Sequence, residues 1–235
     1  AWGDQRSPLL SIICLTYNHA AFIKGTLDGF IRQETDFPFE VVVHDDASTD
    51  STAAIVREYA ARYPNLIKPI YQQENQYQLG VPFSTRLFAQ ARGRYIAYCE
   101  GDDYWTDPRK LQIQVDFLET HRDYVMTYHD AFMFNSQGVV RTPHLTGKYR
   151  KDATALQLQK ARPVSTLTVC FRNLVKELPP ELHGVEGVGA RDLDVAGRDE
   201  REPLGRNGRP RAPRRVPSKS FCEPAESDAT DPLHA

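Results

Sequence analysis

Three short apolar runs, each followed at once by polar or acidic residues, constrain the fold of this chain most strongly. The runs are Leu9–Leu15, Phe39–His44 and Tyr95–Cys99. A run that is apolar on both faces and only as long as a strand is typical of a central strand in a parallel sheet. Apolar side chains also recur at helical spacing over residues 20–32, 52–63, 81–92 and 108–121. Alternating strands and helices of this length predict an α/β domain, in which helices cover both faces of a mostly parallel sheet.

Local signals predict the remaining elements and two helix ends. We expect Asn18 to cap the helix at 20–32, and Gly93 to end the helix at 81–92 as a C-terminal glycine. The further elements expected are an edge strand at 66–71, where Pro69 interrupts the run, a strand at 124–134, a turn at 135–138 that leads into Val139-Val140, a helix at 153–161 and a strand at 164–171.

An acidic tetrapeptide, Glu100-Gly101-Asp102-Asp103, follows the third apolar run directly. Ligands of open α/β sheets bind at the carboxyl ends of the strands. Three carboxylates gathered there repel one another, so a cation would stabilise them. Oxygen ligands suit Mg²⁺ or Mn²⁺, with a diphosphate completing the coordination. The simpler alternative is a solvated acidic turn.

Two other strands end in segments that suit a nucleoside. Thr16-Tyr17-Asn18 ends the first run, and Asp45–Asp50 (DDASTD) ends the second. In a parallel sheet both segments emerge at the same edge as the acidic tetrapeptide. An aromatic ring can stack on a base, a carboxylate can accept hydrogen bonds from ribose hydroxyls or a base N–H, and amides at a helix start favour phosphate. Each segment also has a structural interpretation, with Ser48 or Asp50 as a helix cap and Asp45-Asp46 as a solvated turn.

Together these motifs resemble the family 2 glycosyltransferases of GT-A fold. The resemblance covers residues 8–173, and the spacing of the three motifs makes it specific. It implies transfer of a sugar, with inversion, from a nucleotide diphosphate sugar, a UDP-sugar being the expected donor, to a saccharide, lipid or protein acceptor. It also implies Mg²⁺ or Mn²⁺ as cofactor and a role in polysaccharide biosynthesis.

The resemblance assigns a role to each motif. Thr16 and Tyr17 would line the nucleotide pocket, while Asp45 and Asp46 would hold the base and ribose. The expected binding set also includes Asn18, Ser48 and Arg86. Glu100, Asp102 and Asp103 match the metal-binding DxD-type motif, with Glu100 in the place of its first Asp. Asp102 is the expected direct metal ligand, supported by Glu100, and Asp102 and Asp103 are the expected catalytic acids.

Two departures from the family pattern limit this assignment. Family members often carry Arg-Asn where this chain reads Ser84-Thr85, with Arg86 beside them. An inverting transferase also needs a general base near the acceptor hydroxyl. Asp192 and Asp194 are the nearby Asp candidates, and neither lies in a motif. We therefore expect donor binding with impaired catalysis.

The overall composition is typical of a globular protein, but the C-terminal segment differs in composition from the rest of the chain. At 235 residues, with 26% charged residues and a net charge of −2, it has no bulk attraction for nucleic acid. We expect a glycosyltransferase domain at 8–178, with an incomplete acceptor half. The Arg/Pro/Gly-rich segment 179–235 is expected to be disordered or out of frame. A contact of its arginines with nucleic acid or lipid is the alternative interpretation of this segment, and no nucleic-acid partner is expected.

Cysteine usage and hydropathy bear on the compartment. The four cysteines form no CxxC pair, which favours reduced thiols and a cytoplasmic location. No apolar run reaches the length of a membrane span and no signal peptide is expected. Peripheral association with the cytoplasmic face of a membrane stays open.

Two other function classes fit parts of the pattern. A metal-dependent nucleotidyltransferase also binds its ion at a strand end, but would carry a Gly-rich phosphate loop after the first strand. The third interpretation is a nucleotide-sugar-binding fragment without catalysis. Binding of UDP or GDP with and without Mn²⁺ would distinguish these classes.

Overall fold

We analysed a computed structural model of the chain. It describes residues 7–80, 84–135, 138–140, 152, 154, 164–174 and 219–221. The elements of the larger sheet and its helices are β1 (Leu10–Thr16), α1 (Ile23–Ile31), β2 (Phe39–Asp45), α2 (Thr52–Arg62), β3 (Ile67–Tyr71), α3 (Ser84–Gln90), β4 (Tyr95–Glu100), α4 (Lys110–Thr120), β5 (Met126–His129), the 3-10 helix η2 (Thr166–Thr168), β8 (Cys170–Arg172) and β9 (Lys219–Phe221).

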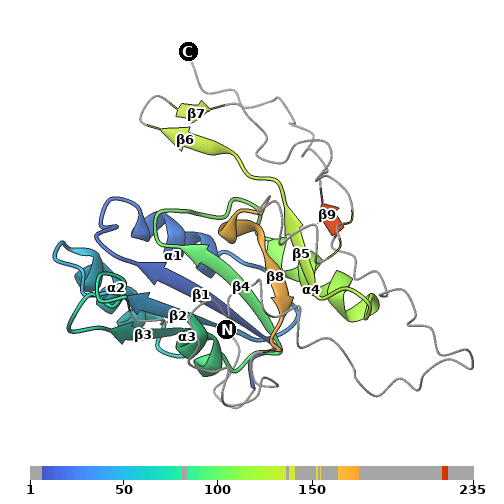
Figure 1. The fold of residues 1–235 in the computed structure, drawn as a ribbon, viewed down its shortest axis with the longest axis horizontal. Helices are drawn as coiled ribbons and strands as arrows, with labels where there is room; N and C mark the ends of the chain where they lie inside the picture. Colours follow the sequence, from blue (N-terminus) through green and yellow to red (C-terminus); the bar gives the residue numbers. More distant parts are fainter. Residues whose placement is uncertain are drawn as a thin grey trace, which may run out of the picture.

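The larger sheet has seven strands in the order β3-β2-β1-β4-β8-β5-β9 (Figure 1). Strands β3, β2, β1 and β4 run parallel to one another, and β9 is parallel to β5. Strand β8 lies antiparallel between β4 and β5. The prediction of a mostly parallel sheet is confirmed, and β3 lies at the edge, as Pro69 predicts.

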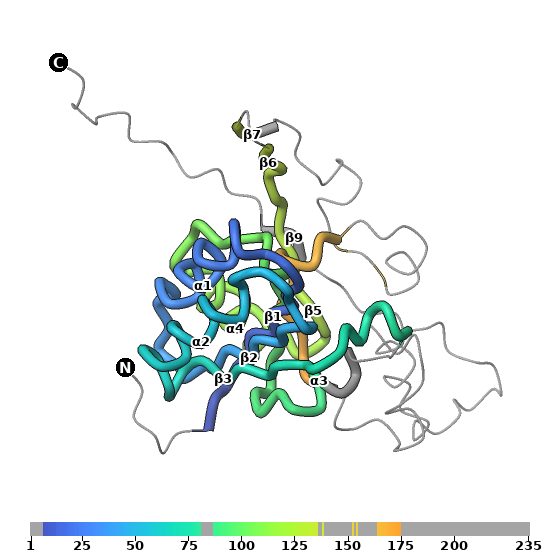
Figure 2. Tube along the Cα trace, turned by 90° about the vertical axis from the view of Figure 1, so that its left-hand side faces the viewer, coloured from blue at the N-terminus to red at the C-terminus, as the bar shows by residue number. Residues whose placement is uncertain are grey.

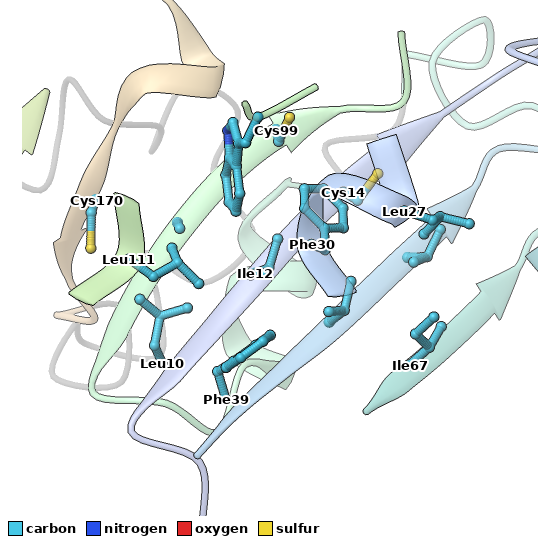
Figure 3. Close-up of a cluster of buried hydrophobic side chains, with 14 of the residues drawn as sticks. Leu10, Ile12, Cys14, Leu27, Phe30, Phe39, Ile67, Cys99, Leu111 and Cys170 are labelled. Atoms are coloured by element: carbon cyan, nitrogen blue, oxygen red, sulfur yellow. The ribbon is translucent and has the colours of Figure 1, made fainter. Parts of the chain in front are cut away.

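Helices cover both faces of the sheet, as predicted (Figure 2). On one face, side chains of α1, α2 and α4 pack on the strands in a single apolar core that includes Leu10, Ile12, Cys14, Leu27, Phe30, Phe39, Ile67, Cys99, Leu111 and Cys170 (Figure 3). On the other face, Leu87 and Phe88 of α3 pack on Ile13, Val42 and Ile96. Both faces of β1 and β2 are therefore buried, which is why the middle of each strand, Ile12–Cys14 and Val41–Val43, is apolar without alternation.

Predictions for two strand segments and for Gly93 are wrong in detail. Residues 124–134 form two strands, β5 and β6 (Met133–Asn135), and β6 pairs with β7 (Gly138–Val140) in a separate hairpin. Residues 164–171 form η2 and only the start of β8. Gly93 does not have a left-handed backbone. It is required instead because a Cβ there would lie 2.5 Å from the Ser11 amide nitrogen.

Part of the predicted pattern lies outside the described residues. This holds for the helix at 153–161 apart from Thr154, and for most of the segment 179–235. Within that segment the described residues Lys219–Phe221 form β9. In the part of the chain that is described, no helix is long and apolar enough to cross a membrane.

Candidate functional site

The candidate site lies where the strand order reverses. Strands β1, β2 and β3 follow one another outward, and β4 then returns to the other side of β1. Ligands of open α/β sheets bind at such a switch point, beyond the carboxyl ends of the strands. The register brings Thr16 beside Asp45 and Leu15 beside Glu100. All three predicted loops therefore meet at one edge, as the sequence predicts.

The end of β1 packs tightly against the acid loop, residues 100–103. The Gly101 amide donates to the Leu15 carbonyl at 2.7 Å, which continues the ladder past the end of β4. A Cβ on Gly101 would lie 2.6 Å from Thr16 Oγ1. Thr16 is 3% exposed, and its Oγ1 has no hydrogen-bond partner among the described residues. Because a buried hydroxyl without a hydrogen-bond partner is unfavourable, binding of a ligand that forms a hydrogen bond with Thr16 Oγ1 would be stabilising. Tyr17, the next residue, is half-buried.

Asn18 and Ser48 join the first two loops to each other. Asn18 has a left-handed backbone with φ of 54°, and its amide donates to Ser48 Oγ at 2.9 Å. Its Oδ1 accepts from the Thr49 amide at 2.8 Å. The expectation that Asn18 caps the helix at 20–32 is wrong, because that helix starts at Ile23 and its N-cap residue makes no side-chain bond. The side chain of Asn18 is engaged by the second loop instead.

Asp45 and Asp46 differ in what their carboxylates contact. Asp45 accepts the Ser48 amide on Oδ2 at 3.2 Å, while its Oδ1 is buried and has no partner in the described part of the chain. Asp46 accepts two backbone amides, from Gln76 at 2.7 Å and from Tyr77 at 3.1 Å. Asp45 thus keeps an oxygen available to a ligand, whereas Asp46 anchors the loop at residues 75–80.

The acid loop concentrates negative charge at the end of β4. Burial, together with the neighbouring Asp102 carboxylate, raises the pKa of Glu100. Burial and repulsion from Asp102 and Glu100 raise the pKa of Asp103 to about 6. The loop is held in place by Thr26 of α1, whose hydroxyl donates to the Asp103 carbonyl at 2.6 Å. These carboxylates are therefore fixed close together, and a divalent cation would relieve the repulsion among them.

The donor set fits a divalent ion only in combination with a ligand. Among the described residues, no group of three His, Cys, Asp or Glu side chains converges closely enough to hold a metal ion alone. The Asp102 carboxylate is 46% exposed at the mouth of the acid loop. Mg²⁺ is usually held by one or two carboxylates together with substrate phosphates and water. Carboxylate oxygens at this position fit that arrangement.

Two residues near the acid loop are not predicted by the sequence motifs. Thr166 of η2 donates to Glu100 Oε1 at 3.4 Å. His19 Nδ1 lies 3.9 Å from Asp102 Oδ1. Thr166 has no local signal, because it reaches the site from 66 residues away. His19 directly follows the Thr16-Tyr17-Asn18 motif, so its position at a strand end was an available signal.

Three expected site residues are not tested by the geometry. Arg86 lies in α3, but its side chain is outside the described part of the structure. Asp192 and Asp194 also lie outside the described residues. The general base therefore stays unassigned.

Comparison with known proteins identifies the family. The model of "Glycosyl transferase family 2" matches residues 11–178. The uncharacterized protein Rv1520 of Mycobacterium tuberculosis is 40% identical over 164 residues, which cover 69% of this chain and 46% of that protein. The aligned part of the chain thus spans about half the length of the mycobacterial relatives it matches.

Solved structures share the fold. TarS of Staphylococcus aureus, residues 1–349 in complex with UDP, has a TM-score of 0.55 at 24% identity, over 79% of this chain and 54% of that chain. The mannosyltransferase PcManGT of Pyrobaculum calidifontis, in complex with GDP-Man and Mn²⁺, has a TM-score of 0.54 at 22% identity, over 82% and 52%. The GT-A fold expected from the sequence is confirmed by these likenesses, and the family match extends over most of the described sheet. The chain belongs to glycosyl transferase family 2.

Proposed function

We propose that this chain binds a nucleotide diphosphate sugar at the β1–β4 switch point and transfers the sugar, with inversion, to an acceptor hydroxyl. The observation that carries this proposal is that two buried oxygens without a hydrogen-bond partner among the described residues, Thr16 Oγ1 and Asp45 Oδ1, lie at the same sheet edge as the acid loop. Unpaired polar atoms suit the nucleoside, and the acid loop suits a metal–diphosphate.

Different residues are proposed to contact different parts of the donor. Asp45 accepts from the base or ribose through its available oxygen, and Asp46 supports this contact through the loop it anchors and through its remaining lone pairs. Thr16 and Tyr17 line the pocket, while Asn18 and Ser48 keep the two loops joined. Arg86 is a further candidate for a contact with the nucleotide.

Asp102 and Glu100 are the proposed ligands of Mg²⁺ or Mn²⁺. Asp103 adds negative charge beside them, which favours binding of the cation. When bound, the ion supplies stabilisation of the negative charge on the departing nucleoside diphosphate. Asp102, which is 46% exposed, would hold the ion from the solvent side of the loop. Thr166 donates a hydrogen bond to one oxygen of Glu100. The PcManGT structure with Mn²⁺ supports this assignment by analogy of fold.

The donor is proposed to be a UDP-sugar and the acceptor a saccharide, lipid or protein. TarS, which is named a poly(ribitol-phosphate) β-N-acetylglucosaminyltransferase and is 30% identical over 186 residues, supports UDP and polysaccharide synthesis. PcManGT with GDP-Man makes GDP the alternative base. Buried free thiols at Cys14, Cys99 and Cys170 support a reducing, cytoplasmic compartment, including its membrane face.

Calorimetric titration with UDP, GDP and their sugars, with and without Mn²⁺, tests the donor site. We expect UDP to bind, to bind more tightly with Mn²⁺, and to lose that metal-dependent gain in Asp102→Asn. Asp116→Asn, on the exposed side of α4, is the matched control and keeps the gain. Metal-independent or absent nucleotide binding would contradict the proposal.

Turnover separates the enzyme from a binding protein. Release of UDP from a UDP-sugar in the presence of acceptor supports transfer. Donor binding without any release would instead support the non-catalytic interpretation, in which this chain holds the donor half of a site. Release at the rate of an intact relative would contradict the expected impairment.

A further inference from the structure

His19 faces the acid loop with an unused ring nitrogen. Its Nδ1 is buried and has no hydrogen-bond partner among the described residues. A Cβ on Gly101 would lie 2.9 Å from this nitrogen, so the imidazole edge points at the residue just before Asp102. Leaving a buried polar atom unpaired is unfavourable, because the atom has lost its hydrogen bonds to water. The arrangement therefore favours an additional ligand at this nitrogen.

The position of the imidazole is set by the backbone around it. The His19 carbonyl accepts the amides of Phe22 and Ile23, both at 2.9 Å, and so starts the turn that leads into α1. The next amide, that of Ala20, donates to Asp50 Oδ2 at 3.0 Å. Because both sides of the residue are tied down, the ring is presented to the acid loop by a fixed part of the chain.

The spacing of His19 and Asp102 suits one shared ion. Two atoms that bind the same ion at about 2.1 Å each can lie no more than about 4.2 Å apart. The distance from His19 Nδ1 to Asp102 Oδ1 is 3.9 Å, which is within that limit and too long for a hydrogen bond. An ion between the two atoms would satisfy the nitrogen and lower the repulsion among the carboxylates.

We propose that His19 Nδ1 is a second protein ligand, beside Asp102, of the divalent ion in this site. This inference rests on the proposed function, which supplies the ion and the diphosphate. Two protein ligands leave the remaining positions to phosphate oxygens and water. This agrees with the finding that no three side chains converge among the described residues. First-row transition metals bind imidazole better than Mg²⁺ does, so the site prefers Mn²⁺ to Mg²⁺.

Pulsed electron paramagnetic resonance of Mn²⁺ bound to the full chain with UDP tests this ligand directly. The wild-type spectrum is expected to show coupling to a bound nitrogen-14. In protein grown with nitrogen-15 histidine, that coupling is expected to change to the nitrogen-15 pattern. His121→Gln, at the end of α4, is the control and is expected to keep the signal. The labelled wild-type protein needs no substitution, so this measurement holds even where a variant folds poorly.

Two substitutions then separate ligation from packing. His19→Asn keeps an oxygen near the position of Nδ1, so Mn²⁺ still binds, the nitrogen coupling is lost and the preference for Mn²⁺ over Mg²⁺ falls. His19→Ala removes the ligand, and the Mn²⁺ dissociation constant is expected to rise on the order of tenfold. Circular dichroism and thermal unfolding verify that each variant is folded.

The outcomes distinguish this inference from the proposed function. Mn²⁺ bound with UDP but without histidine-nitrogen coupling overturns the role of His19 and leaves the proposed donor site intact. The same is true if the coupling persists in His19→Asn. Absence of any Mn²⁺ binding by the wild-type chain with UDP contradicts the metal assignment of the proposed function, and this inference with it.

Discussion

Gly101 and Thr16 lie so close together that the glycine has no room for a side chain. A Cβ at Gly101 would lie 2.6 Å from Thr16 Oγ1 and 2.8 Å from Thr16 Cβ. Thr16 is buried within the end of β1, so it cannot move aside as a flexible surface chain would. Gly101→Ala therefore separates the ends of β1 and β4. We expect a loss of stability of about 1–3 kcal/mol and much weaker UDP binding by calorimetry.

Gly25→Ala is the matched control for that substitution. Gly25 lies within α1, and a Cβ there meets nothing within 4 Å. Alanine is the better helix former, so this variant is expected to gain up to about 1 kcal/mol in urea unfolding and to bind UDP normally. Equal UDP affinity in both variants would show that the packing of Gly101 does not shape the donor site.

Asp45→Asn and Asp46→Asn are expected to differ in their effects. Asp45→Asn changes the carboxylate that has an available oxygen, so UDP affinity falls while stability changes little. In Asp46→Asn, one of the two side-chain oxygens that accept these amides becomes an NH₂ group, which can only donate. The loss of that hydrogen bond is expected to cost about 1–3 kcal/mol of local stability. Hydrogen exchange at the Gln76 and Tyr77 amides is then expected to accelerate. Unchanged exchange at both amides would contradict the anchoring role of Asp46.

The buried amine of Lys110 is expected to make the stability of the fold depend on pH. Burial lowers the pKa of its amine to about 8, and its Nζ donates to Gln114 Oε1 and lies 4.1 Å from the centre of the Trp105 ring. Between pH 8 and about 10.5 the unfolded chain binds this proton and the folded chain does not, so stability rises with pH in that range. Below pH 8 both states are protonated and the cost of burying the charge is fully present.

The difference in unfolding free energy between wild type and Lys110→Met isolates this effect. It is expected to change in favour of the wild type by up to about 1.4 kcal/mol per pH unit between pH 8 and 10.5. Lys24→Met, at an exposed position of α1, is expected to show no such trend. A pH-independent difference for Lys110→Met would refute the buried-charge explanation.

Arg92 and Arg94 offer a matched test of two ion pairs. Arg92 Nη2 lies 2.6 Å from Oε2 of Glu40, whose side chain is 3% exposed and also accepts from Ser11 Oγ. Arg94 Nη2 lies 2.6 Å from Oε1 of Glu119, and both side chains are exposed. In urea unfolding we expect Arg92→Ala to cost about 2–4 kcal/mol and Arg94→Ala less than about 1 kcal/mol. Similar costs would mean that burial of Glu40 does not govern the pair.

The parts of the fold that follow from the sequence are those set by local pattern. Strand β2 was expected at 39–44 and is found at Phe39–Asp45, because a run buried on both faces has few alternatives. Strand β5 ends earlier than expected because the Asp130 side chain accepts the Ala131 amide at 3.0 Å, a local bond that competes with sheet pairing. Similarly, Thr168 Oγ1 donates to the Ser165 carbonyl and stabilises η2 where a strand was expected.

The parts of the site that do not follow from the sequence depend on contacts between distant segments. The motifs correctly placed Thr16, Asp45 and the acid loop at one edge, since parallel strands require it. The unequal roles of Asp45 and Asp46 could not be predicted, because they arise from amides about 30 residues away. The position of His19 likewise depends on a distant contact, since the amide of the next residue, Ala20, donates to Asp50 Oδ2.

Strand β8 lies between β4 and β5 in the sheet, although it follows both of them in the sequence. It pairs with β4 on one side and β5 on the other, although β5 precedes it by about 40 residues. During synthesis, β5 therefore leaves the ribosome before its neighbour exists, whereas β1 to β4 can assemble without it. A nascent chain interrupted between β5 and β8 would carry a nearly formed nucleotide edge beside an open flank on β4, which is a ready template for pairing with another chain.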